Sequence, residues 1–273
     1  MSPIPVERHV LALSGGWDST ALALELTKRE PRAYTFVCTP TGDEPDEMFA
    51  FWNRLGGLLG APILPVMNVE VGGLNALIAH YGALPNPRQR WCTRRLKIEP
   101  YRDQLKRWAA EGPVTSYVGL RADEAGRAGG AYDDIDGVTM RFPLREWGWD
   151  RAAVVSSLEQ QGVIPPDRTD CKRCYHQTLG EWWMLWRFSP ADWASAVSQE
   201  ASTKSTFRTP RLLDGEPVMV TRWGLNFASC WRDTWPVRLA DMQALFEQGL
   251  IPRRTPLQTD LVRQSGQCRV CTL

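Results

Sequence analysis

A short strand that runs into a Ser/Gly-rich turn and then a helix constrains this chain more than any other feature. The apolar residues 9–13 precede the turn at 14–20, SGGWDST, and residues 21–26 continue as a helix. Two glycines let backbone N–H groups come close to a phosphate, and the positive end of the helix dipole favours an anion. Asp18 and Ser19 fall in the first helical turn, where a carboxylate can hold a metal and a hydroxyl can bond a phosphate oxygen. The plainer alternative is an ordinary turn before a capped helix.

A second strand and a second polar turn follow at a distance that makes a βαβ unit. Residues 33–38 are strand-like and end at the turn-rich segment 39–44, TPTGDE. Apolar residues at helical spacing predict a helix over 44–59, and residues 61–69 predict a third strand. A strand–helix–strand unit implies a parallel sheet with a right-handed crossover. Because ligands bind beyond the carboxyl ends of such strands, we expect the two turns to face one crevice.

Composition narrows the class of protein. The chain has 273 residues, 43% of them hydrophobic and 23% charged, which is ordinary for one large globular domain or a domain with a small addition. No run approaches the ~18 apolar residues of a membrane span, and the first residues lack the apolar core of a signal peptide. We therefore expect a soluble, cytoplasmic protein without a membrane partner. The net charge of +1 does not by itself indicate nucleic acid.

The string SGGxDS differs from the Walker loop, which needs GxxxxGK[ST]. It resembles the pyrophosphate-binding loop (PP-loop) of the adenine nucleotide alpha-hydrolase superfamily, whose members cleave ATP between the α and β phosphates or bind an adenylyl sulfate. Four later segments resemble the phosphoadenylyl-sulfate (PAPS) reductase-like branch of that superfamily. They are TGDE at 41–44, RWCTRRLK at 90–97, GLRADEAGR at 119–127 and PLREW at 143–147. The resemblance implies that PLREW ends a strand and leads into the last core helix, over 150–160.

This resemblance, which spans residues 10–174, implies an α/β fold with a Rossmann-like parallel sheet flanked by helices. It implies a nucleotide-binding domain over 1–165, followed by a helical region with cysteine pairs over 166–273. A pair of aromatic amphipathic helices over 180–197, a polar linker over 198–209 and a helix over 237–248 are expected there. The ATP-binding residues that the resemblance implies are Ser14, Gly15, Gly16, Asp18, Ser19, Thr20, Thr41, Gly42, Arg90, Arg94, Gly119 and Arg127.

Basic residues concentrate between positions 85 and 107, where eight Lys or Arg residues face two acids. A solvated helix face explains residues 102–107, whereas Arg90, Arg94 and Lys97 are our candidates for anion contact, because guanidinium and ammonium groups suit phosphates. For Arg121 and Arg127, contact with a phosphate or sulfate-like group competes with a simple surface ion pair to Asp123 or Glu124.

The seven cysteines argue for metal or redox chemistry rather than disulfides in a cytoplasmic protein. Two CxxC pairs, Cys171 with Cys174 and Cys268 with Cys271, can complete one tetrahedral zinc site that holds the C-terminal tail to the body. Cys38 and Cys230 are interpreted as buried or incidental, and a packing role is preferred for the nearby His176.

The alternative adds Cys92 and a [4Fe–4S] cluster, as in the similar adenylyl-sulfate reductases. The residue before Cys92 is Trp91, so one cysteine of that family's pair is missing. In one arrangement of the cluster ligands, Cys268 or Cys271 replaces the missing cysteine. In another, only three cysteines bind the cluster and one iron has no protein ligand, as in the two-thiocytidine tRNA sulfurtransferases. We favour iron–sulfur over zinc because Cys92 lies in the predicted crevice.

The first functional hypothesis is an ATP pyrophosphatase that adenylates an acceptor, with Mg²⁺ held near Asp18 and sulfur delivered through the cysteines. By resemblance the acceptor is tRNA or DNA, or a small molecule, and a sulfur donor protein is a possible partner. The residues assigned to catalysis are Asp18, Ser19, Cys92, Lys97 and Arg121.

Two alternatives stay open. The first is reduction of PAPS or adenylyl sulfate by a cysteine nucleophile. Those reductases carry an ECGLH-like tail, whereas this chain ends GQCRVCTL. The second is a non-catalytic nucleotide-binding subunit with structural zinc, which binds ATP without releasing pyrophosphate.

Overall fold

The structure is a computed structural model that describes most of the chain, in two compact units. The described residues are 7–124, 126–127, 132–166, 168–208, 212–213, 216–217, 238–249 and 252. Within them, the first unit comprises 7–73 and 92–170, and the second comprises 74–91 and 171–252. The sequence pattern gave no sign that residues 74–91 pack with the later part of the chain.

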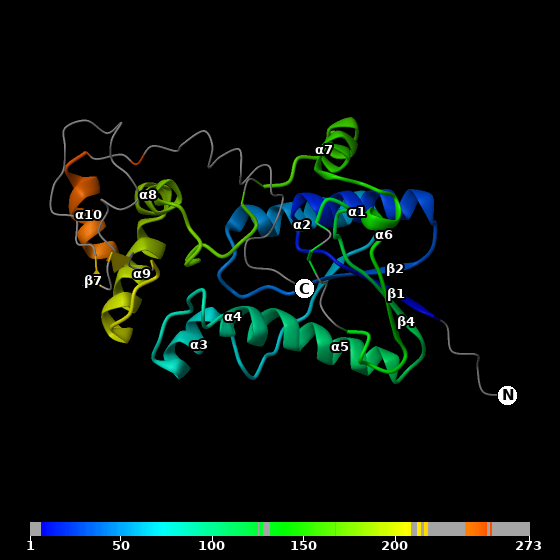
Figure 1. The fold of residues 1–273 in the computed structure, drawn as a ribbon, viewed down its shortest axis with the longest axis horizontal. Helices are drawn as coiled ribbons and strands as arrows, with labels where there is room; N and C mark the ends of the chain where they lie inside the picture. Colours follow the sequence, from blue (N-terminus) through cyan, green and yellow to red (C-terminus); the bar gives the residue numbers. More distant parts are fainter. Residues whose placement is uncertain are drawn as a thin grey trace. The chain divides into compact units, whose positions relative to one another are not determined.

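The first unit is built on a five-stranded sheet in which every strand is parallel to its neighbours (Figure 1). The strands are β1 (Arg8–Ala12), β2 (Tyr34–Cys38), β3 (Ile63–Pro65), β4 (Val114–Tyr117) and β5 (Val138–Arg141). Their order is β3-β2-β1-β4-β5. The chain passes from β1 to β2 and β3 on one side, and then places β4 and β5 on the other side of β1, so the strand order switches between β1 and β4. Open α/β sheets bind ligands at such a switch point. The predicted Rossmann-like fold class is confirmed.

Helices cover both faces of this sheet, as Figure 1 shows for α1 and α5. On one face lie α1 (Trp17–Arg29), α2 (Asp46–Leu59) and α7 (Arg151–Gln160). On the other face lies α5 (Glu99–Ala109). Neighbouring strand residues point to opposite faces, so Leu11 packs with the first group of helices and Val10 packs with α5.

Two elements differ from the sequence-based expectation. The third strand is three residues long instead of 61–69, and it ends at Pro65, which has no N–H to donate to a ladder. The PLREW segment is the short helix α6 (Pro143–Glu146), because Pro143 is pre-organised for a first helical position. The strand before it, β5, ends at Arg141. The helix expected over 150–160 is α7, and Asp150 caps it by accepting the Ala153 N–H at 2.9 Å.

The second unit is mainly helical. Its elements are α3 (Leu74–Tyr81), α8 (Leu179–Phe188), α9 (Pro190–Thr203), the hairpin strands β6 (Leu212–Leu213) and β7 (Glu216–Pro217), and α10 (Leu239–Glu247). Thr178 and Glu181 form a capping box at the start of α8. The fully buried Trp182 contacts the rings of Trp193 and Phe207, so the predicted aromatic helix pair shares one core. The expected linker over 198–209 is helical as far as Thr203.

One buried carboxylate ties three segments of this unit together. Glu200 accepts hydrogen bonds from the backbone N–H groups of Phe207 at 3.0 Å and Leu239 at 2.7 Å.

Among the helices of the described residues, none has the length and apolarity needed to cross a membrane.

Candidate nucleotide-binding site

The turn between β1 and α1 is held tightly against α2. Gly15 has a left-handed backbone with φ of +85°, and a Cβ added there would lie 2.7 Å from both Met48 Cε and Trp52 Nε1. The Trp52 indole N–H donates to the Ser14 carbonyl oxygen at 3.3 Å. Since only glycine fits both the backbone angle and the space, the turn has one conformation beneath the Trp52 ring.

Replacing Gly15 with alanine is expected to lower the free energy of unfolding by about 2–4 kcal/mol, from left-handed strain and overpacking together. A matched control is Gly57→Ala, because Gly57 lies inside α2 with no atom near its missing Cβ. That variant should gain about 0.5–1 kcal/mol through helix propensity. Urea unfolding of both variants measures the difference, and equal stabilities would contradict the packing described here.

The first turn of α1 exposes backbone donors to the end of the sheet. The helix begins at Trp17 with Gly16 as its N-cap, and no side chain caps it. The Ser14 and Ser19 hydroxyl oxygens lie 3.1 Å apart, and Ser19 also donates to the Gly16 carbonyl at 3.2 Å. A Cβ on Gly119 would lie 3.1 Å from the Ser19 backbone nitrogen, so the segment after β4 packs directly on this turn. The arrangement is that of a helix N-terminus prepared for an anion.

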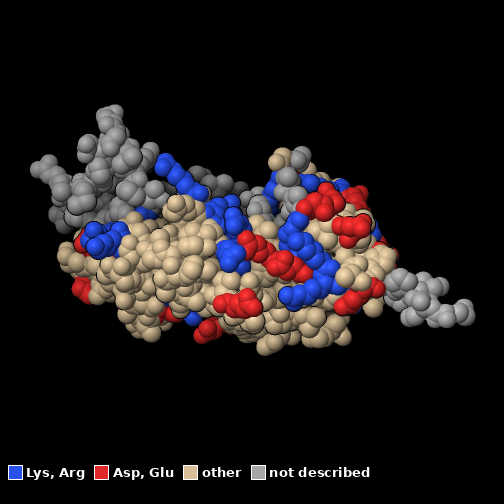
Figure 2. Space-filling model, turned by 90° about the horizontal axis from the view of Figure 1, so that it is seen from below, with Lys and Arg blue, Asp and Glu red and all other residues tan. Residues whose placement is uncertain are grey.

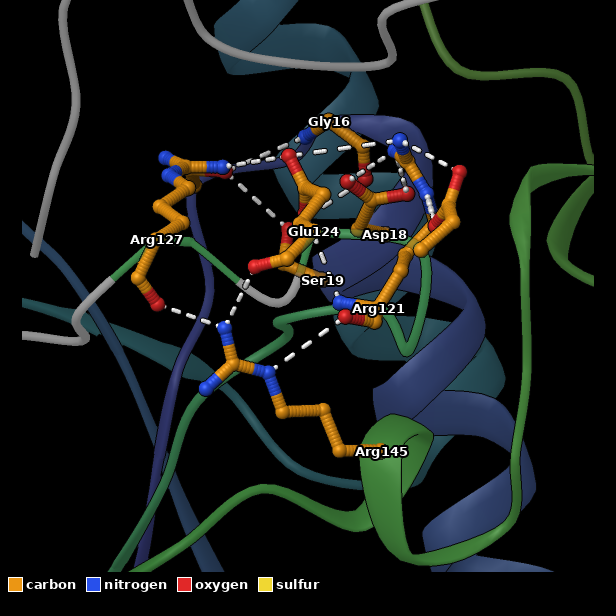
Figure 3. A network of polar contacts seen from close by, with 9 residues as sticks. Gly16, Asp18, Ser19, Arg121, Glu124, Arg127 and Arg145 are labelled. Atoms are coloured by element: carbon orange, nitrogen blue, oxygen red, sulfur yellow. Dashed lines mark hydrogen bonds and ion pairs between the residues drawn. The ribbon is translucent and has the colours of Figure 1, made fainter.

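Asp18 forms a buried ion pair with Arg121 beside this helix end (Figure 3). Nη1 of Arg121 lies 3.2 Å and 3.0 Å from the two carboxylate oxygens of Asp18. Arg121 is 3% exposed to solvent and Asp18 is 6% exposed. Burial raises the pKa of Asp18 to about 6, although the Arg121 charge and hydrogen bonds oppose this rise. Burial therefore outweighs the ion pair, and Asp18 titrates close to physiological pH.

A loop after β4 holds Arg121 through two further carboxylates. Its Nε donates to Asp123 at 2.8 Å, and Glu124 lies within ion-pair distance on the other side. Burial lowers the pKa of Arg121, but the surrounding carboxylates raise it by more. Glu124 in turn accepts from Arg127 at 3.0 Å. Ion pairs, which were the alternative to phosphate contact, therefore form for both arginines, but Arg121 is buried and also contacts Asp18.

Arg145 fixes the backbone of the same loop from α6. Its guanidinium donates to the carbonyl oxygens of Arg121 at 3.4 Å, Glu124 at 2.8 Å and Arg127 at 2.5 Å. Figure 3 shows Arg145 reaching from α6 toward this loop, opposite the end of α1. Arg145 was not among the candidate site residues, because its position within PLREW gave no sign of this structural role.

The TGDE turn after β2 is held by its own glutamate. The buried Glu44 carboxylate accepts the Thr41 N–H and hydroxyl, both at 2.7 Å, and the Gly42 N–H at 3.0 Å. A Cβ on Gly73 would lie 2.9 Å from the Thr41 carbonyl oxygen, so the turn also packs against backbone. The two turns thus follow the carboxyl ends of adjacent strands, as expected for β1 and β2.

The remaining basic candidates have different surroundings. Lys97 is buried in a five-residue π-helix (Arg94–Ile98), which follows the short helix α4 (Trp91–Thr93) that contains Cys92. Such π-helical segments are frequent at functional sites. Arg94 pairs with Glu99 at 2.9 Å with its side chain largely exposed. Arg90 belongs to the second unit, whereas Arg94 and Lys97 belong to the first.

Ion pairs also neutralise part of the basic segment. Arg95 shares Glu99 with Arg94, and Arg102 pairs with Asp134. On the face of the molecule seen in Figure 2, acidic and basic atoms accordingly lie side by side. The local excess of positive charge in the sequence therefore does not appear on this face as a continuous basic strip.

The cysteines divide between the units. Cys92 is buried in the first unit, and Cys171 and Cys174 are buried in a turn of the second, where the His176 N–H lies 3.5 Å from the Cys174 sulfur. Cys268 and Cys271 lie outside the described residues. No three His, Cys, Asp or Glu side chains gather as a metal site in the described part of the chain. Burial raises the pKa of Cys38 to about 12, which keeps that thiol protonated.

One site residue was missed entirely. Arg151 begins α7 directly after the Asp150 cap, and its side chain lies within electrostatic range of Asp18, Arg121 and Asp123. No sequence motif marks this position, since it is separated from the loop by a strand and the short helix α6. Only the folded chain brings it to Asp18.

Comparison of the sequence with protein-family models and with curated proteins gives no match. Among solved structures, the chain is similar to the crystal structure of phosphoadenylyl-sulfate (PAPS) reductase from Candida auris, determined as a phosphate complex. The identity is 14% and the TM-score 0.46, over 58% of this chain and 74% of that one.

Proposed function

We propose that the chain binds an adenine nucleotide at Ser14–Thr20, cleaves ATP between its α and β phosphates, and transfers the adenylyl group to an acceptor. The observation that carries this proposal is the uncapped start of α1, with the Asp18–Arg121 pair buried beside it. Backbone N–H groups and a guanidinium converge there, and both stabilise charge on a departing pyrophosphate.

The ion pair gives Arg121 and Asp18 complementary roles. Without nucleotide, Arg121 donates to both Asp18 oxygens, which keeps each buried charge compensated. An arriving phosphate group competes for the guanidinium and releases the carboxylate. Mg²⁺ is held in proteins by one or two carboxylates together with substrate phosphates, so a single released Asp18 fits that requirement. Asp18 would hold the ion there, and the ion would supply neutralisation of the pyrophosphate charge.

A pH dependence follows from the Asp18 pKa of about 6. Below that pH the carboxyl is protonated and cannot hold a cation, so the dissociation constant of Mg²⁺–ATP should rise about tenfold for each pH unit below 6. The folded pKa lies above the ordinary value of 3.8, so the stability contribution of this group is full below pH 4 and is lost as the pH rises through 6. Weaker binding at pH 5 therefore does not come from Asp18-linked unfolding.

Isothermal titration calorimetry between pH 5 and 7.5 measures this dependence. Thermal unfolding at each pH is the control. A dissociation constant that stays the same over this range would contradict the assignment of Asp18 as the cation ligand.

For the chemistry that follows adenylation, we propose sulfur transfer through the cysteines, with tRNA or DNA as the acceptor and a sulfur donor protein as partner. The described residues supply the buried cysteines Cys171 and Cys174 as one pair, which is half of the set that a zinc or iron–sulfur centre requires. Iron, sulfide and zinc analysis of protein purified without oxygen decides between the two centres. About four irons and four sulfides per chain would support sulfur transfer, and one zinc would make the pair structural.

The reaction itself is tested by following labelled ATP with Mg²⁺ and pooled tRNA or DNA. Pyrophosphate and an adenylylated acceptor are the expected first products, and AMP follows when a sulfur nucleophile or water displaces it from the acceptor. ADP and phosphate would show cleavage at the wrong bond. Sulfite released from PAPS or adenylyl sulfate, without pyrophosphate from ATP, would assign sulfonucleotide reduction instead. Nucleotide binding with none of these products would favour the non-catalytic subunit.

A further inference from the structure

Arg151 carries a buried nitrogen that lacks a partner among the described residues. Its Nη1 has almost no solvent-accessible surface and makes no hydrogen bond there. Buried polar groups in folded proteins are nearly always hydrogen-bonded, and an unsatisfied charged group is costly. A guanidinium kept in this state requires an explanation.

The surroundings of Arg151 are those of the proposed site. Burial lowers the pKa of Arg151, as does the Arg121 charge, whereas Asp18 and Asp123 raise it. Two guanidiniums therefore lie within electrostatic range of each other near the start of α1. Arg121 already donates to both Asp18 and Asp123. These contacts leave the Nη1 of Arg151 as the unsatisfied donor.

The backbone holds the two arginines in a fixed relation. The Ala122 N–H donates to the Trp149 carbonyl oxygen at 2.8 Å. This hydrogen bond joins the loop after β4 to the residues that lead into α7. A rigid pair of guanidiniums at a helix N-terminus is suited to an anion that bears charge on several oxygens.

We propose that Arg151 binds a non-bridging oxygen of the pyrophosphoryl group, opposite Arg121. This inference rests on the proposed function, since it takes the nucleotide phosphates to lie at the start of α1. It adds a binding residue outside the loop motifs. It also explains why a buried donor is left unsatisfied without ligand: the anion completes its hydrogen bonds.

The test compares Arg151→Met with Arg107→Met, which removes the same charge from an exposed position on α5. Calorimetry with inorganic pyrophosphate and with AMP gives the affinities, and thermal unfolding without ligand gives the stabilities. For Arg151→Met we expect pyrophosphate to bind at least tenfold more weakly and AMP to bind within twofold of wild type. Its unfolding midpoint should be unchanged or higher, because methionine removes a buried nitrogen that makes no hydrogen bond among the described residues. Arg107→Met should match wild type throughout.

Equal pyrophosphate affinity in wild type and Arg151→Met would overturn the inference. So would a lower unfolding midpoint together with weaker AMP binding, which would make Arg151 structural, and so would a wild-type protein that binds no pyrophosphate. If pyrophosphate binding depends on Arg151 but the protein does not cleave ATP to AMP, the inference about Arg151 holds and the proposed function fails.

Discussion

Replacing Arg121 with methionine is expected to lower the free energy of unfolding by about 3–5 kcal/mol, the range for removing one partner of a buried ion pair. The reason is that the carboxylate of Asp18, nearly inaccessible to solvent, would then lose its ion-pair partner, and the buried Glu124 would keep only Arg127. The pKa of Asp18 should rise further, because burial would act with less opposition. Urea unfolding at pH 7.5 measures the loss.

The structure predicts a marked asymmetry between the two partners. In Asp18→Asn, Arg121 keeps its contacts with Asp123 and Glu124, so the loss of stability should be well below that of Arg121→Met. Combining the two substitutions should recover part of the stability lost in Arg121→Met, since the double variant no longer buries the Asp18 charge alone. If the effects of the two substitutions simply add, the coupling between Asp18 and Arg121 is refuted.

Asp18→Asn is expected to reduce pyrophosphate release from ATP about a thousandfold, or about 4 kcal/mol in the barrier. Asparagine keeps the shape of the side chain and loses the charge that holds Mg²⁺ against the pyrophosphate. The midpoint of thermal unfolding should change little, which separates this loss from misfolding. AMP and pyrophosphate measured over hours at saturating Mg²⁺ give the rate. Wild-type turnover in this variant would refute the role assigned to Asp18, and Arg107→Met is the matched control for nonspecific charge effects.

The fold class could be predicted because its signals are local. A buried strand, a turn with two glycines and a helix are adjacent in the sequence, and a second strand, polar turn and helix follow at residues 33–59. Each feature depends on neighbouring residues, so chain order alone gives the parallel sheet. The structure then confirms the parallel sheet and its flanking helices.

The detailed site depends on distant partners, which a single sequence does not reveal. Asp18 and Arg121 are more than a hundred residues apart, and the burial that moves the pKa of Asp18 comes from the whole fold. Arg151 is the first residue of α7, where the sequence pattern is that of an ordinary solvent-exposed helix end. Arg94 is the reverse case. Its position within a basic motif predicted contact with an anionic ligand, whereas in the structure it pairs with the nearby Glu99.

Equilibrium binding of α,β-methylene ATP, which cannot be cleaved at the proposed bond, tests the central claim most directly because it requires no acceptor. Calorimetry with Mg²⁺ at pH 7.5 should show one site per chain in wild type, the same affinity in Arg107→Met, and at least tenfold weaker binding in Asp18→Asn. Absence of binding to the wild-type protein, or equal affinity in Asp18→Asn, would contradict the assignment of Ser14–Thr20 as a nucleotide pyrophosphate site.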